Sequence, residues 1–197
     1  MDHQLEKLIG EKRFGEYLHG VRYGDEHLVH LYYKFDLELR GIYMKSIGVV
    51  EHRLASLLSS ELAKEQSLTF GDLRRNFSAK TPKDRFEVSR KLGLKNQKEV
   101  DGLLSSLNSF RNRAAHHERI WNFRARLAVP KRTLDLGLSE MGVVESPFSL
   151  AANLIGIDLL VPHESRILNL AGDLSEAINQ SCIDRSFILK SMGFKVP

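Results

Sequence analysis

The 197-residue sequence has a single cysteine, five prolines and no long apolar run. One cysteine excludes an intrachain disulfide and a zinc module built on several thiolates. The longest apolar stretch, residues 150–161, contains Asn153 and Asp158, and it is shorter than the roughly 18 residues that a membrane span needs. The first residues are polar and mixed in charge, unlike a secretion signal. We therefore expect a cytoplasmic protein that makes no membrane contact.

The composition is that of an ordinary globular domain, with 42% hydrophobic and 27% charged residues. A chain of this length predicts a single domain over residues 1–197 with a sizeable core. Residues 1–30 form a less well defined extension: Leu5, Leu8 and Ile9 suggest a short helix, and several glycines then break the pattern. No function can be read from that extension.

The positive charge is concentrated in one part of the chain. Between residues 111 and 132 seven cations face one acid, Glu118, so this stretch carries +6 while the whole chain carries +4. Six of the seven are arginines, whose planar guanidinium groups suit phosphate better than ammonium groups do. The pattern is compatible with binding of nucleic acid and equally with a solvated helix face. The cations are Arg111, Arg113, Arg119, Arg124, Arg126, Lys131 and Arg132.

Apolar residues recur at intervals of three and four over most of the chain, which predicts an all-α bundle. A long connection is expected at residues 124–147, with a possible extended piece at 126–129. Gly48 indicates a bend or a close helix contact, and Cys182 is expected in the core. The predicted helices cover residues 31–64, one beginning at Thr69, one from Thr81 to near Gly93, 97–123, one between Pro147 and Pro162, and 164–181.

The segment most suggestive of chemistry is residues 110–122. On a continuous helix Asn112, His116 and Arg119 would share one face, whereas Arg111 would lie about 140° from His116. Three explanations remain open for that separation: a distorted helix after Ala114, convergence on a ligand, or a meeting with a second copy of the chain. Arginines beside a histidine indicate an anion site, with acid–base work for the imidazole and charge stabilisation for the guanidinium.

Other chemistries fail on their spacing. His117-Glu118 begins a His-Glu-x-x-His pattern, but Trp121 stands where the second histidine is required. Adjacent residues on a helix point in different directions, so His116, His117 and Glu118 make a poor metal cluster. No glycine-rich phosphate loop and no Gly-x-Ser-x-Gly elbow occurs. We therefore expect neither a metal nor a cofactor.

The segment Arg-Asn-Arg-Ala-Ala-His-His-Glu-Arg-Ile-Trp-Asn, residues 111–122, resembles the signature of the Abi-like (Abi_2, AbiD/AbiF) abortive-infection family of bacteria. Four further stretches are similar to that family: residues 31–40, which contain Tyr-Lys-Phe-Asp-Leu-Glu-Leu-Arg, and residues 50–54, 68–73 and 191–197. The family is related to the HEPN superfamily of helical bundles, many of which are metal-independent ribonucleases with an Arg-x(4 to 6)-His motif. Arg111 and His116 enclose four residues and fit that spacing, as does the five-residue gap to His117.

The resemblance implies a HEPN-like endoribonuclease that acts in phage defence as a homodimer with two motifs facing each other. The implied catalytic residues are Arg111, His116 and Asn112, with His116 as general acid or base, Arg111 on the phosphate and Asn112 orienting one of them. Glu118 would hold Arg111 or Arg119. The implied supporting residues are His117, Glu118, Arg119 and Asn122, and the implied RNA contacts are Arg113, Arg124, Arg126, Lys131 and Arg132.

Two alternatives share this fold. One is a non-catalytic RNA-binding module that holds a small non-coding RNA with the same basic residues. The other is an interaction protein in which residues 111–122 only stabilise helix packing.

Overall fold

The computed structural model describes residues 3–21, 25–58, 68–135, 143–161 and 167–196. Within these ranges the chain forms ten helices, and β-pairing is limited to one isolated bridge between Val144 and Phe194. The prediction of an all-α bundle is confirmed. No helix in these ranges is both long and apolar enough to cross a membrane.

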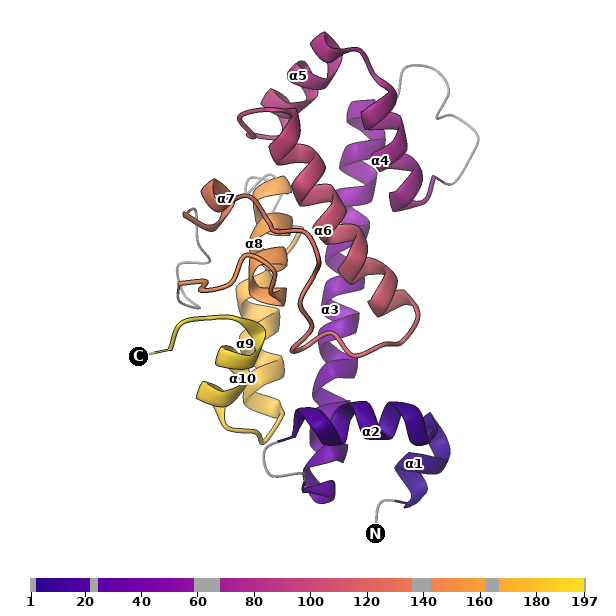
Figure 1. The fold of residues 1–197 in the computed structure, drawn as a ribbon. Helices are drawn as coiled ribbons and strands as arrows, with labels where there is room; N and C mark the ends of the chain where they lie inside the picture. The colour runs from indigo at the N-terminus through magenta and orange to yellow at the C-terminus, as the bar shows by residue number, and fades with distance from the viewer. Residues whose placement is uncertain (1–2, 22–24, 59–67, 136–142, 162–166, 197) are drawn as a thin grey trace.

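Helix α3 (Glu26–Leu58) is the axis of the bundle. Its 33 residues extend over about 50 Å, and Figure 1 shows the other helices arranged around it. Helices α1 (His3–Ile9) and α2 (Glu11–Gly20) lie at its N-terminal end, with α2 packed against α3. One side of α3 has an apolar residue at every third or fourth position and is buried along its length. These residues are Val29, Tyr32, Phe35, Leu39, Tyr43, Ile47, Val50 and Leu54.

Helices α4 (Phe70–Ala79) and α6 (Gln97–Ala115) pack against α3 and against each other, and α5 (Pro82–Lys91) joins them. Helices α8 (Leu150–Leu160) and α9 (Leu170–Gln180) also pack on α3. The short helices α7 (Lys131–Asp135) and α10 (Arg185–Met192) contact α8 and α9 respectively. The C-terminal end of α6 is thus left at the edge of the bundle, away from α8 and α9 (Figure 1).

Three predicted helix starts are confirmed by their caps. The Thr69 side chain accepts the amide of Asp72, whose carboxylate accepts the amide of Thr69 in return. Thr81 caps α5 with Pro82 in the first turn, and Asn96 caps α6. These local hydrogen bonds fix the first turns of α4, α5 and α6.

The predicted end of the motif helix is wrong. The apolar spacing predicts a helix through residue 123, but α6 ends at Ala115 and residues 116–130 follow as an irregular segment. The apolar spacing of Ala114 and Trp121 continues past the true end because Trp121 is buried by the loop, not by the helix. The possible extended piece at 126–129 is not a strand, although Ala125 and Val129 donate their amides to the carbonyls of Phe148 and Pro147.

Several glycine and cysteine predictions also change. Gly15 and Gly20 lie inside α2 and do not break it. A Cβ on Gly48 would meet no atom within 4 Å, so a close helix contact does not explain this glycine. Cys182 is exposed in the turn between α9 and α10, with φ +57°, because α9 ends at Gln180.

The C-terminal segment closes the bundle. Gly193 ends α10 with φ +103°, and a Cβ there would lie 2.4 Å from Ser149. Phe194 is fully buried, and Lys195 donates its amide to the carbonyl of Val143 at 2.6 Å. Residues 191–194 therefore hold the connection before α8 in place.

Candidate functional site

The end of α6 is a tight cap formed by the motif itself. The amide of Glu118 donates to the carbonyl of Arg113 at 2.8 Å, and the amide of His117 donates to that of Ala114 at 3.1 Å. This is the Schellman pattern, which needs a left-handed residue and usually takes glycine. Here His117 occupies that position with φ +57°. The backbone therefore reverses at the two histidines and presents both side chains at the surface.

The segment after the cap is anchored by a buried carboxylate on α3. Asp36 is fully buried, and its Oδ1 accepts the backbone amides of Ile120 and Trp121, each at 2.9 Å. The Trp121 ring packs between Tyr32 and Phe187, with centroids 5.1 and 6.1 Å away. The position of the loop that follows the histidines is thus fixed by the core.

Asp36 is itself held by a polar network. Its Oδ2 accepts the Tyr17 hydroxyl at 2.7 Å and lies 3.3 Å from Nε of Arg40, which is 4% exposed. Burial raises the pKa of Asp36, while the hydrogen bond from Tyr17, the amide of Ile120 and the charge of Arg40 oppose that rise. Burial likewise raises the pKa of Tyr17. The network joins α2, α3 and the segment after α6.

Each of the three motif arginines has a partner in the protein. Nε of Arg111 lies 3.3 Å from Oε1 of Glu51 on α3, and both side chains are about one quarter exposed, at 27% and 26%. Arg113 pairs with Glu118 at 2.8 Å and stacks on Phe123. Glu118 was expected to hold Arg111 or Arg119, and that expectation is wrong.

Arg119 leaves the face on which the helical wheel placed it. It donates to the carbonyl of Glu16 on α2 and lies over the rings of Tyr17 and Trp121. Burial lowers the pKa of Arg119. Because α6 has ended by this point, Arg119 cannot stack with Asn112 and His116. It ties α2 to the loop instead.

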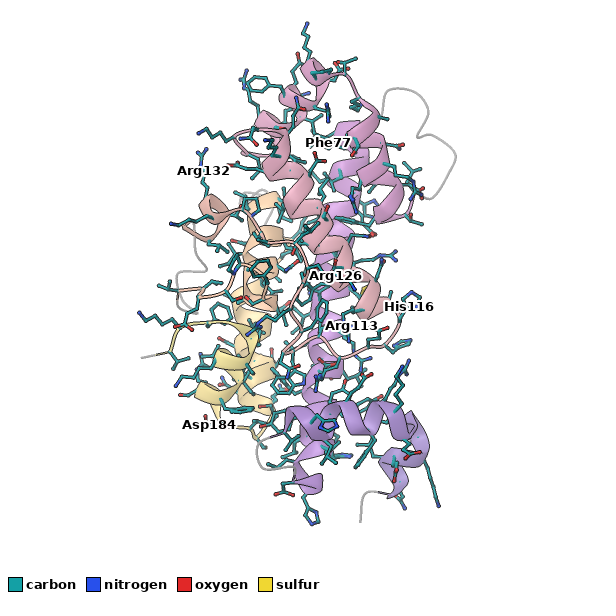
Figure 2. All side chains as sticks on the ribbon, viewed as in Figure 1. Phe77, Arg113, His116, Arg126, Arg132 and Asp184 are labelled. Carbon is teal, nitrogen blue, oxygen red and sulfur yellow. The ribbon has the colours of Figure 1, made fainter. Side chains whose placement is uncertain are left out.

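The imidazoles and the neighbouring amide are used differently. His116, His117 and Asn112 are exposed, and in the described part of the chain their side chains make no hydrogen bond or ion pair. The carbonyl of His116 accepts Arg13 from α2 at 3.1 Å, which holds the backbone but not the ring. Figure 2 shows His116 at the edge of the molecule. Asn122 is half-buried, with an Oδ1 atom that has no partner among the described residues.

The fold disperses the remaining basic residues. Arg124 donates to the carbonyl of Ser191 at 3.2 Å, and burial lowers its pKa. Arg126, Lys131 and Arg132 are exposed, the last two on α7. Figure 2 shows Arg132 and His116 on opposite sides of the view with Arg126 between them. The high local charge in the sequence does not become one basic surface around His116.

Two carboxylates of α3 contact the motif segment but are not among the site residues predicted from the sequence. Asp36 stands within an apolar helical stripe beside Phe35 and Leu39, and a charged residue in such a stripe requires a buried partner. Glu51 follows Val50 and is partly exposed, so its position gives no such signal. Only the fold shows that both carboxylates reach residues 111–121.

No cluster of three or more His, Cys, Asp or Glu side chains suited to a metal is found among the residues that the structure describes. The site consists of a rigid helix cap, two exposed imidazoles, an exposed amide and one guanidinium oriented by a carboxylate. Such a set can exchange protons and bind an anion at a surface.

Comparison with known proteins supports one family. Residues 63–122 match the family model described as Abi-like protein. The matched range ends at Asn122, contains all of residues 111–122 and also covers the 68–73 stretch; the 31–40, 50–54 and 191–197 stretches lie outside it. No curated protein and no solved structure matches the chain. The match supports the Abi-like resemblance.

Proposed function

We propose that this protein is a metal-independent endoribonuclease of an abortive-infection defence system, and that it acts as a HEPN-type homodimer in the cytoplasm. The observation that carries the proposal is the contrast at the end of α6. The arginines are engaged by the protein, whereas His116 and Asn112 are exposed on an anchored backbone and free to contact a substrate. The family match supports the role in defence.

In this proposal His116 exchanges protons with the ribose 2′-hydroxyl and with the leaving 5′-oxygen. An imidazole can both accept and donate a proton near neutral pH. Attack by the neighbouring 2′-hydroxyl is intramolecular and restricts cleavage to RNA. Asn112, one turn before His116, would hydrogen bond to the phosphate or the imidazole.

Arg111 would stabilise the charge that develops on the phosphate. Its Nε contacts Glu51, which fixes the plane of the guanidinium. The terminal nitrogen atoms have no partner in the described ranges and can form a bidentate contact with phosphate. Arg111 and His116 are about 140° apart around a helix, so we propose that Arg111 of one protomer serves the site of its partner.

The test is cleavage of mixed-sequence single-stranded RNA by the full chain in EDTA. The wild type should release products with 2′,3′-cyclic phosphate ends, and His116→Ala should abolish them. Because His116 is exposed, the free energy of unfolding of the His116→Ala protein should differ from that of the wild type by less than about 0.5 kcal/mol. His30→Ala, an exposed histidine of α3, is the matched control and should remain active. If the wild type cuts no RNA, the catalytic proposal fails.

Mixing two inactive variants tests the shared site. Arg111→Ala and His116→Ala should each be inactive alone. In a mixed dimer, one site would combine the intact Arg111 and the intact His116 from different protomers, so activity should partly return. If both residues came from the same protomer, no mixed dimer would contain a complete site and activity would stay absent.

A second function, RNA binding without cleavage, is favoured by the Glu51 contact. A carboxylate beside Arg111 reduces the positive charge available to a transition state. A protein of this kind would bind a small RNA with an affinity that falls steeply with salt, and it would leave that RNA intact. Salt-dependent binding without any cyclic phosphate product would select this second function.

A further inference from the structure

A hollow lies between α4 and α6, upstream of His116 along α6. It has a volume of about 510 Å³ and is lined by Gly71, Arg74, Arg75, Ser78, Ala79 and Asn108. We call it the α4/α6 groove. Its lining includes two arginines, a serine and an asparagine, and none of the cations between residues 111 and 132. Figure 1 shows α4 beside α6, which runs on past it to the histidine end.

The groove contains two guanidinium groups that a ligand can reach. Arg74 is exposed and has no polar partner among the described residues. Arg75 forms an ion pair with Asp72, but its side chain is 75% exposed. Exposed ion pairs contribute little to stability, so a phosphate can replace Asp72 as the partner of Arg75. The Asp72 carboxylate also accepts the amide and the hydroxyl of Thr69 in the helix cap, so it keeps two hydrogen bonds when Arg75 binds a phosphate instead.

One residue of the groove lining, Asn108, lies on α6 two turns before the candidate catalytic end of that helix. Asn108 and Asn112 are four residues apart and therefore neighbours on one helix face, and His116 follows at the next turn. Asn108 is half-buried at the groove, while Asn112 and His116 are exposed. The distance along the axis from Asn108 to His116 is about 12 Å. A row of amide groups thus connects the two arginines to the imidazole.

We infer that the α4/α6 groove binds the phosphodiester backbone of single-stranded RNA and directs the strand along Asn108 and Asn112 to His116. This inference rests on the proposed function, for which it supplies the path of the substrate. Arg74 and Arg75 bind phosphates in a sequence-independent way, while the two asparagine amides contact phosphate, ribose or base. Arg126 and Arg132, on other parts of the surface, contribute little to this path.

The experiment measures binding of a fluorescein-labelled, mixed-sequence single-stranded RNA to the full chain in the His116→Ala background, where the RNA stays intact. Adding Arg74→Gln and Arg75→Gln should weaken binding at least tenfold and lower the salt slope by about 1 to 2. The matched control carries Lys83→Gln and Arg90→Gln, two exposed cations of α5 outside the groove. It has the same charge loss and should bind within twofold of its parent. Circular dichroism verifies that both variants are folded.

The outcomes separate this inference from the proposed function. If the Arg74→Gln/Arg75→Gln variant binds RNA as its parent does, the inference that the groove binds RNA is overturned and the ribonuclease proposal stands. A loss confined to an Arg126→Gln/Arg132→Gln variant also overturns the groove. If the wild type cuts no RNA but the groove variant still loses affinity, the ribonuclease proposal is overturned and RNA binding by the groove is supported. Absence of RNA binding by the parent overturns both.

Discussion

The carboxylate of Asp36 accepts the backbone amide of Trp121 at 2.9 Å in the interior of the protein. This hydrogen bond joins two segments that are 85 residues apart in the chain. Glu51 and Arg111 form a second link between α3 and the motif. Helix α3 therefore sets the backbone of the loop after the histidines through one carboxylate and orients the motif's first arginine through another.

Removal of the Asp36 carboxylate should be strongly destabilising. Asp36→Ala leaves the buried guanidinium of Arg40 without its ion-pair partner and two backbone amides without their acceptor, which should lower the free energy of unfolding by about 3 to 5 kcal/mol. Tyr17→Phe removes a single hydrogen bond to the same group and should lose about 1 to 1.5 kcal/mol. Urea unfolding of the two variants measures the difference. Equal losses would show that Asp36 has no larger role than one hydrogen bond.

The same carboxylate should make stability depend on pH. Burial raises the pKa of Asp36 in the folded protein, whereas the unfolded chain titrates near the ordinary value of about 3.9. The folded state therefore holds this proton more tightly, and the stability that the group contributes is greatest below about pH 3.9 and falls as pH rises through the folded pKa. The stability of the wild type relative to Asp36→Asn should decrease over that window in urea titrations. A constant difference between the two proteins would contradict the raised pKa.

Replacement of His117 should separate the two histidines. A side chain in the left-handed region is unfavourable by about 1 to 2 kcal/mol, so His117→Gly should leave stability unchanged or raise it by up to about 1 kcal/mol. His116→Gly, at φ −90°, gains no such relief and should be mildly destabilising because glycine is the more flexible residue. Thermal unfolding compares the two. If His116 is the catalytic histidine, the His117→Gly protein should still cleave RNA. Loss of cleavage in that variant would mean that His117 is the catalytic histidine.

Two glycines in different surroundings should respond in opposite directions. Gly193→Ala introduces a Cβ at φ +103° and 2.4 Å from Cβ of Ser149, so it should lose more than about 2 kcal/mol of stability. Gly48→Ala, inside α3 with open space around the new atom, should gain up to about 1 kcal/mol. Ser149→Ala retains the Cβ and should not rescue Gly193→Ala. Urea midpoints report all three, and a tolerated Gly193→Ala would refute the close contact with Ser149.

Glu51 should act as a positioning residue for Arg111. Glu51→Gln removes a partly exposed ion pair, which should change stability by less than about 1 kcal/mol. Because the guanidinium is no longer held in one plane, kcat for RNA cleavage should fall at least tenfold while KM changes little. Glu118→Gln breaks the comparable pair with Arg113 and is the control. Equal effects of the two variants would mean that Glu51 has no specific role.

The helical class, the starts of α4, α5 and α6, and the apolar face of α3 follow from the amino-acid sequence alone. Each of these depends on neighbours a few residues apart: an apolar residue every third or fourth position, or a Thr or Asn side chain that accepts an amide three residues ahead. The sequence also located the motif at residues 111–122, since its arginines, histidines and asparagines are adjacent in the chain.

The end of α6, the contacts of each arginine and the set of basic residues near His116 depend instead on how the helices pack. Trp121 continues the helical spacing, yet it is buried because Asp36, 85 residues away, holds its amide. Glu51, Glu118 and the carbonyl of Glu16 each take one motif arginine. Such pairings depend on which segments the packing of the helices brings together, and no local rule of spacing encodes that.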